Sequence, residues 1–307
     1  MNPSFSLDPL SDLHQLLAYP FMVHALQAGS IVAVMAAVAG WFMVLRRESF
    51  AGHTLAVMSF PGASAAALAG VPLPSGYFAF CAAGALAIAG ASRTQGRRNL
   101  AQESAVVGTV QAVALGAGFL LLSLYHGVLE SLETLLFGSF LGISSDQVLT
   151  LLVSAIAVLA FFALAGRPLL FASVDEDVAR AGGVPVRALS IAFLLVLGLT
   201  VAATAQITGV LFVFALLVAP AATAQQLTPR VGLGLALSVL IGLLITWFGL
   251  ALSYFTNYAA GFYVTSLAIV LYTTARLIRM VTAAPARRPP AADGPLRSGL
   301  ARALDAP

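Results

Sequence analysis

The 307-residue sequence contains no lysine, and all 15 of its positively charged side chains are arginines. A chain without lysine cannot carry the phosphate-binding loop G-x-x-x-x-G-K-[ST], and it cannot form a Schiff base through a lysine amine. By itself it therefore cannot be a P-loop ATPase. The single cysteine, Cys81, allows neither an internal disulfide nor a thiolate cluster for a metal ion.

Charged residues of either sign are also scarce. They make up 9% of the chain, whereas a soluble domain carries roughly 25%. The hydrophobic content is 60% and the mean hydropathy is +0.97. Apolar runs repeatedly reach about 20 residues, the length that crosses a bilayer as a helix. The sequence therefore predicts an all-α polytopic membrane protein.

The apolar runs define about nine expected transmembrane helices. Eight or ten are the alternatives, because the third run is short and only the polar stretch 204–208 separates the sixth from the seventh. The expected spans are 21–45, 50–70, 75–91, 103–125, 148–167, 187–205, 207–227, 231–253 and 260–280.

Every arginine falls on the same side of these nine spans. Positive residues in short loops stay in the cytoplasm, so we expect the N-terminus outside the cell and the C-terminus inside. Residues 1–20 would then form an extracytoplasmic segment, and residues 21–282 the transmembrane domain. Residues 283–307, rich in proline, alanine and arginine, are expected to be a disordered cytoplasmic tail.

Residues 171–187 predict a short amphipathic helix on the cytoplasmic face. Ser173 is the expected N-cap, and three acidic residues follow it in the first turn, where the helix dipole favours negative charge. Gly182 or Gly183 would supply a left-handed C-cap, and Pro185 prevents the helix from continuing. Such a segment would be a short rigid rod connecting the fifth and sixth spans.

Four motifs in the chain resemble those of the permease subunits of zinc- and manganese-type ABC importers. The resemblance implies that residues 171–187 contain the helix that couples the permease to its ATPase. In that segment the matching residues are Val174, Asp175, Ala179, Gly183 and Val184. The expected ATPase-coupling residues are Asp175, Glu176, Ala179 and Gly183. The other motifs comprise Arg46, Arg47 and Gly52 with Pro61 and Gly62; Leu136, Phe137 and Gly138 with Ile143 and Asp146; and Gly209 with Pro220.

This resemblance implies a multi-pass ABC importer permease in a bacterial cytoplasmic (inner) membrane. It would work as a homodimer with cytoplasmic ABC ATPase subunits and an extracytoplasmic metal-binding protein. Its cargo would be Zn²⁺ first, and Mn²⁺ or Fe²⁺ next. The chain itself would bind no cofactor and catalyse no covalent chemistry, because ATP is used by the partner subunit. No contact with nucleic acid is expected.

The sequence departs from the family pattern at one position. After the glycine that matches Gly52, the family has an aspartate and, four residues later, a histidine, whereas this chain has His53 and Val57. Nitrogen ligands suit zinc better than manganese, so His53 is a candidate for the translocation path and favours zinc. Hydrogen bonding between helices is the alternative role. His24 is a second candidate, with an interfacial or packing role as its alternative.

Three other classes of protein compete with this interpretation. A permease for an iron chelate or cobalamin would have a similar architecture, with about ten spans. A secondary transporter would need acidic residues near the middle of its spans, and the expected spans contain none there. A membrane enzyme would need paired carboxylates, an H-E-x-x-H motif or a Ser/His/Asp set, which are also absent from the spans.

Overall fold

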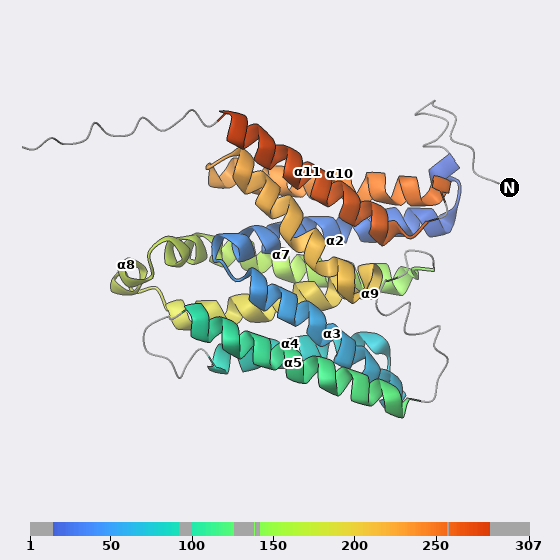
Figure 1. The fold of residues 1–307 in the computed structure, drawn as a ribbon, viewed down its shortest axis with the longest axis horizontal. Coiled ribbons are helices and arrows are strands. Elements are labelled where there is room, and N and C mark those ends of the chain that lie inside the picture. Colours follow the sequence, from blue (N-terminus) through green and yellow to red (C-terminus); the bar gives the residue numbers. More distant parts are fainter. Residues whose placement is uncertain (1–14, 92–99, 126–137, 139–141, 257, 283–307) are drawn as a thin grey trace, which may run out of the picture.

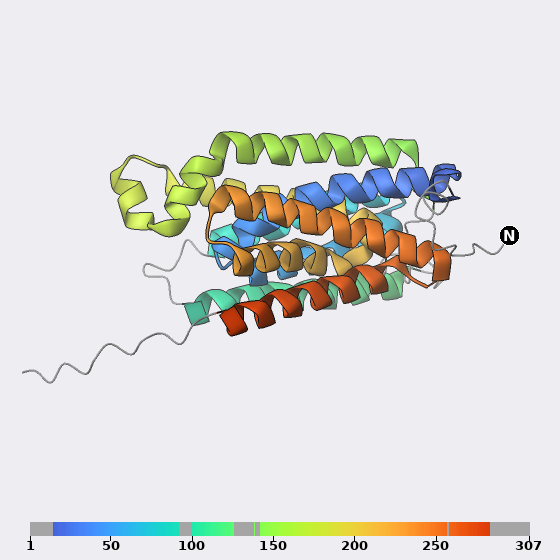
Figure 2. The same cartoon turned by 90° about the horizontal axis from the view of Figure 1, so that it is seen from above.

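The computed structural model describes residues 15–91, 100–125, 138, 142–256 and 258–282, and all regular structure in these ranges is helical. The long helices lie side by side in one bundle, and the shortest one projects beyond the bundle at one end (Figures 1 and 2). The helices are α2 (Pro20–Leu45), α3 (Ser49–Ala69), α4 (Leu73–Ala91), α5 (Leu100–Leu124), α7 (Ser145–Val174), α8 (Glu176–Ala181), α9 (Val186–Leu227), α10 (Val231–Thr256) and α11 (Ala260–Thr282).

Seven of the described helical segments are long and apolar enough to cross a membrane, which makes the chain a multi-pass membrane protein. Two of the expected spans, 50–70 and 207–227, are not among these seven segments. Serine, threonine, histidine and glycine lower the hydropathy of α3, and Phe212–Leu227 is apolar but shorter. The seven segments are Pro20–Leu45, Leu73–Gly90, Ser104–Leu124, Ser145–Val174, Val186–Val210, Val231–Thr256 and Ala260–Thr282.

Helix α9 is broken at Gly209, whose backbone angles are φ 71° and ψ 162°. This region is accessible essentially to glycine alone. The part before the break crosses the bundle from the α8 end, and the part after it returns toward that end (Figures 1 and 2). We expected the break at the polar stretch 204–208. That position is wrong because Thr204 and Thr208 donate their hydroxyls to carbonyls one turn earlier and stay helical.

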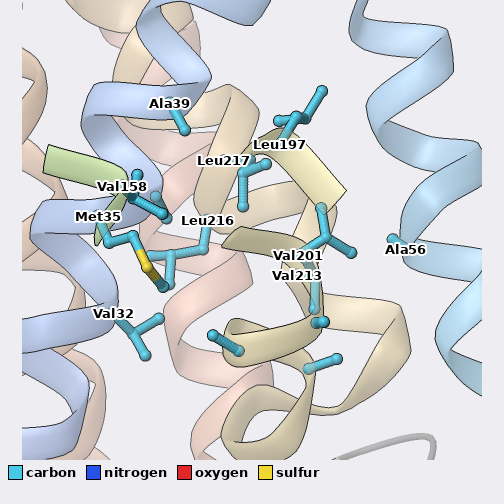
Figure 3. Close-up of a cluster of buried hydrophobic side chains, with 14 of the residues drawn as sticks. Val32, Met35, Ala39, Ala56, Val158, Leu197, Val201, Val213, Leu216 and Leu217 are labelled. Carbon is cyan, nitrogen blue, oxygen red and sulfur yellow. The ribbon is translucent and has the colours of Figure 1, made fainter. Parts of the chain in front are cut away.

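The core lies where α2, α3, α7 and both parts of α9 meet (Figure 3). In the most apolar stretch of α2, 72% of the residues are buried, whereas the share is 17% in α5 and 17% in α11. Helix α2 is therefore central, and α5 and α11 present most of their apolar side chains to the surroundings. The core side chains labelled in Figure 3 are Val32, Met35, Ala39, Ala56, Val158, Leu197, Val201, Val213, Leu216 and Leu217.

Glycines allow the central helices to touch through their backbones. A Cβ on Gly62 of α3 would collide with the carbonyl of Gly76 in α4, and a Cβ on Gly76 would collide with that of Gly62. Gly40 of α2 lies equally close to the carbonyl of Leu217 in α9. Helix association in lipid depends on such close approach. Gly62, predicted from its motif, is therefore a packing residue, and its neighbour Pro61 is buried beside it.

Candidate functional site

Helix α8 begins at Asp175 and stands outside the bundle (Figure 2). The Asp175 carboxylate accepts hydrogen bonds from the backbone N–H groups of Asp177, at 3.1 Å, and Val178, at 3.0 Å. Glu176 and Asp177 occupy the first turn and Arg180 the last, as the helix dipole favours. Asp175 is therefore the residue that fixes the start of this helix.

The short helix expected within 171–187 is present as α8, but its predicted N-cap at Ser173 is wrong. Helix α7 continues through Pro168 to Val174, and the Ser173 hydroxyl donates to the Leu169 carbonyl inside its last turn. The stretch consists of the end of α7, the six-residue α8 and the start of α9. An aspartate with extended backbone angles accepts the orphan N–H groups, and this leaves Ser173 inside the preceding helix.

The end of α8 is fixed by a left-handed glycine, as predicted. Gly183 has φ +82°. The N–H of Val184 donates to the Ala179 carbonyl at 3.0 Å, and the N–H of Gly182 donates to the Val178 carbonyl at 2.9 Å. These bonds satisfy the last carbonyls of the helix and turn the chain toward α9.

We expected the small side chain of Ala179 to let the helix fit closely against a partner, but Ala179 faces the interior of its own chain. Its side chain is fully buried and packs in a small cluster with Ala172 and Val186. A larger residue would not fit there, because α8 lies directly on α7 and on the start of α9. Among the exposed apolar residues at this end, Val174 and Val178 lie beside or on α8, at 76% and 52% exposure. They, with the acidic first turn, form the surface that a partner could contact.

Arg46 connects the α2–α3 turn to both helices that flank α8. Its Nε donates to Glu48 Oε1 at 3.0 Å, and its Nη2 to the Ser190 hydroxyl at 3.0 Å. Its Nη1 lies 3.4 Å from the Ser173 hydroxyl, and its guanidinium stacks 5.0 Å from the centre of the Phe193 ring. The side chain is only 4% exposed. A buried arginine thus binds the ends of three long helices together.

The rest of this motif shapes the same turn. Arg47 adopts a left-handed backbone conformation with φ 59°. A Cβ on Gly52 would collide with the sulfur of Met43, so the first turns of α3 lie against the end of α2. The motif that identified Arg46, Arg47 and Gly52 therefore specifies a compact connection between two helices.

His53 follows this turn on α3 and is half-buried. Its ring lies edge-on to Phe214 in the second part of α9, with the ring centres 5.0 Å apart. Its Nδ1 is buried and has no hydrogen-bond partner among the described residues. The adjacent Thr54 donates to Gln111 Oε1 of α5 at 3.2 Å. An imidazole nitrogen without a partner fits a residue that meets a transient ligand.

His24 lies at the other end of the bundle, in the first turns of α2. Its Nδ1 is 3.1 Å from the carbonyl oxygen of Ile143. This contact fastens α2 to the segment before α7, where Ser144 and Gln147 form a capping box. The structure does not bring His24 and His53 together, and the contacts of His24 are those of a packing residue.

No group of three or more His, Cys, Asp or Glu side chains in the described part of the chain could hold a metal ion. Pro220 is buried inside α9 near Gly242 of α10. The motif residues Leu136 and Phe137 and the predicted tail 283–307 lie outside the described residues.

Three functional neighbours could not have been found by reading along the sequence. Ser190, Phe193 and Phe214 carry no motif, and each becomes notable only through a contact with a residue far away in the chain. The clue to two of them is the buried Arg46 side chain, because a charged residue in the interior needs hydrogen-bonding partners.

Comparison with known proteins agrees with this architecture. Residues 18–279 match the profile of the ABC 3 transport family. The manganese transport system membrane protein MntC of Halalkalibacterium halodurans is 29% identical, covering 85% of this chain and 88% of the relative. The chelated iron transport system membrane protein YfeC of Yersinia pestis is 28% identical, covering 86% and 88%. The fold resembles PsaBC from Streptococcus pneumoniae, with a TM-score of 0.76, 24% identity and coverage of 91% and 97%.

Proposed function

Because the chain belongs to the ABC 3 transport family, we propose that it is the membrane-spanning permease of an ATP-driven importer for a divalent metal ion. The observation that carries this proposal is α8, a short helix capped at both ends that projects from one end of the bundle (Figure 2). Its three consecutive acidic residues would each cost about 2.5 kcal/mol or more at the centre of a membrane. It therefore stays in water, where a soluble ATPase can reach it.

The cargo we propose is manganese or iron, with zinc as the third candidate. The relatives named above are a manganese system and a chelated-iron system. The sequence favoured zinc because His53 replaces a carboxylate. However, one imidazole does not distinguish zinc from iron, since both metals accept nitrogen ligands. The half-buried His53 ring, with its unpartnered Nδ1, supports a brief contact with the ion on its way through the protein.

We also propose nine crossings, with the N-terminus outside and the C-terminus in the cytoplasm. The opposite directions of the two parts of α9 support counting them as two crossings (Figure 1). The arginine-bearing helix ends gather at the α8 end: Arg46 reaches Ser190, and Arg279 donates to Gln226 at 2.7 Å. Positive residues retained on one side identify that end as cytoplasmic.

The proposed assembly has cytoplasmic ATPase subunits at α8, an extracytoplasmic metal-binding protein at the opposite end and a second copy of this chain. Small half-buried residues on the second part of α9, namely Ala215, Ala219 and Ala222, support close packing of another helix there. The exposed apolar surfaces of α5 and α11 require cover from lipid or from that second copy.

Uptake by the reconstituted transporter tests this function. Proteoliposomes would contain the full chain with its partner ATPase and the metal-binding protein. They would be supplied with ⁵⁴Mn²⁺ or ⁵⁵Fe²⁺, with unlabelled Zn²⁺ as the competitor. We expect accumulation that requires ATP and a catalytically intact ATPase. Accumulation driven by an ion gradient without ATP would contradict the proposal and identify a secondary transporter. Transport of a ferric chelate, but of no free ion, would identify a chelate permease.

A further inference from the structure

In the proposed transporter a push on α8 has to reach the helix that carries His53, and Arg46 contacts elements on both sides of that path. We propose that Arg46 is the positioning residue through which movement of α8 is transmitted to α3. The inference rests on the proposed function, because it concerns how that transport is driven. The inference gives a mechanical role to Arg46, which the sequence analysis identified only as a motif residue and as one of the arginines that define the cytoplasmic side.

The first half of the connection runs from α8 to Arg46. Helix α8 packs on the end of α7 and on the start of α9 through buried Ala179. Ser173 belongs to the last turn of α7 and Ser190 to the beginning of α9, and Arg46 donates to both hydroxyls. The two helices that carry α8 are therefore held by the same guanidinium group. A displacement of α8 that moves both helices must move that group or break its hydrogen bonds.

The second half runs from Arg46 to His53. Glu48 is the N-cap residue of α3, and it forms an ion pair with Arg46 at 2.9 Å. Met43, near the end of α2, contacts Gly52 of α3 with no room for a side chain between them. His53 is the next residue. The start of α3 therefore contacts both Arg46 and the end of α2, so a displacement of Arg46 is passed to it through the ion pair with Glu48.

Burial makes this connection stiff. The Arg46 side chain is 4% exposed and that of Glu48 is 14% exposed, so water cannot easily replace their partners. A buried charge that loses its partners carries a large desolvation penalty. The planar guanidinium also offers several donors in a fixed geometry, which a flexible ammonium group does not. Arg46 can thus hold one acceptor on each of three elements at once.

The sharpest test removes the two serine hydroxyls and leaves the buried ion pair intact. The double variant Ser173→Ala, Ser190→Ala would be compared with Ser154→Ala, which removes from α7 a hydroxyl with the same backbone bond but without contact to Arg46. The readout is metal transported per ATP hydrolysed in proteoliposomes containing the ATPase. We expect this ratio to fall at least about tenfold in the double variant, because it loses two hydrogen bonds to a charged group and the loss of one already corresponds to roughly that factor. ATPase binding and hydrolysis should persist, and Ser154→Ala should match wild type.

An unchanged ratio in the double variant, with ATP-dependent uptake by the wild type, would overturn the role of Arg46 and leave the importer proposal standing. Absence of ATP-dependent uptake by the wild type would instead contradict the proposed function itself. These two results are distinguishable because they are measured on different proteins in the same assay.

A distance measurement tests the rigid connection without transport. Spin labels would be placed at exposed Phe50 on α3 and exposed Ala181 on α8, in a Cys81→Ala background of the full chain assembled with its ATPase. We expect one narrow distance distribution that is the same with and without ATP. The double serine variant should broaden that distribution or shift it between the two states. A distribution that already changes on ATP addition in the parent protein would overturn the inference.

Discussion

Gly138 lies directly against Gly209, at the point where α9 is broken. A Cβ on Gly138 would collide with the backbone of Ile207, Thr208 and Gly209. Both glycines have positive φ angles, +74° and +71°. Two of the motifs found in the sequence therefore meet in space, and Gly138, between α5 and α7, lies against the break that reverses the direction of α9.

We predict that Gly209→Ala and Gly138→Ala each destabilise the protein. A side chain at Gly209 would be strained by roughly 1–3 kcal/mol, and a methyl group at Gly138 would push the two backbones apart. The matched control is Gly116→Ala in α5, which has open space around it and helical geometry. Thermal unfolding of the purified protein in detergent measures the effect. Melting temperatures equal to that of Gly116→Ala would show that the contact contributes nothing.

Val178→Glu should prevent the ATPase from docking on α8. Val178 is exposed on a helix that projects into water, and a carboxylate buried there against a partner would have no compensating charge. We expect affinity for the ATPase to fall by at least about tenfold, which corresponds to 1.4 kcal/mol. Co-purification and a titration with labelled ATPase measure this.

The control for Val178→Glu is Leu227→Glu, a matched substitution of an exposed apolar residue at the end of α9. It should bind the ATPase as wild type does. Ala179→Trp is not a useful docking probe, because Ala179 is buried within its own chain and the larger ring would displace α8. Normal binding by Val178→Glu would exclude α8 as the docking surface.

The two histidines should separate cleanly in function. His53→Ala should lower metal uptake at limiting concentration by at least about tenfold, as loss of a metal-contacting group does, and leave membrane insertion unchanged. His24→Ala should keep uptake per molecule but lose about 1 kcal/mol of stability, because its hydrogen bond to the Ile143 carbonyl disappears. Unchanged uptake by His53→Ala would make His53 a packing residue against Phe214.

Helix positions could be predicted from hydropathy because lipid requires long apolar runs, and the expected spans overlap the helices of the structure. The ends were harder to place. We expected the fifth span to end at residue 167, yet α7 continues through Pro168 to Val174. Threonines suggested a gap near 206, yet their hydroxyls bond within the helix and the break occurs at Gly209. Polar residues can satisfy their own helix, so polarity alone does not locate a break.

The sequence singled out some residues of the candidate site, but neither their arrangement nor their partners from distant segments. Arg46, Gly183 and His53 were all identified from motifs. Ala179 faces inward because α8 packs back onto α7, and the sequence contains no signal for the direction in which α8 packs. Likewise, Ser190 and Phe193 become partners of Arg46 only because the start of α9 returns to the end of α2. Contacts between distant segments require the fold.

The membrane topology has a direct test at the two ends of α9. If the break at Gly209 separates two crossings, Arg187 and Arg230 lie on the same side of the membrane. If α9 is one long span, they lie on opposite sides. Arg187→Cys and Arg230→Cys, each in a Cys81→Ala background, place thiols at exposed positions. A thiol reagent that cannot cross the membrane should label both in inside-out vesicles and neither in intact cells.

Reporters at Ser4 and Ala306 complete that test, because nine crossings put the two chain ends on opposite faces. We expect Ser4 to be labelled in intact cells and Ala306 in inside-out vesicles only. Labels on the same face would require an even number of crossings. That result, with Arg187 and Arg230 still on one side, would place the error in another span and not in α9. Labelling of Arg187 and Arg230 on opposite faces would instead show that α9 crosses the bilayer only once. The arginines would then lie on both sides of the membrane, contrary to the preference of positive residues for the cytoplasm.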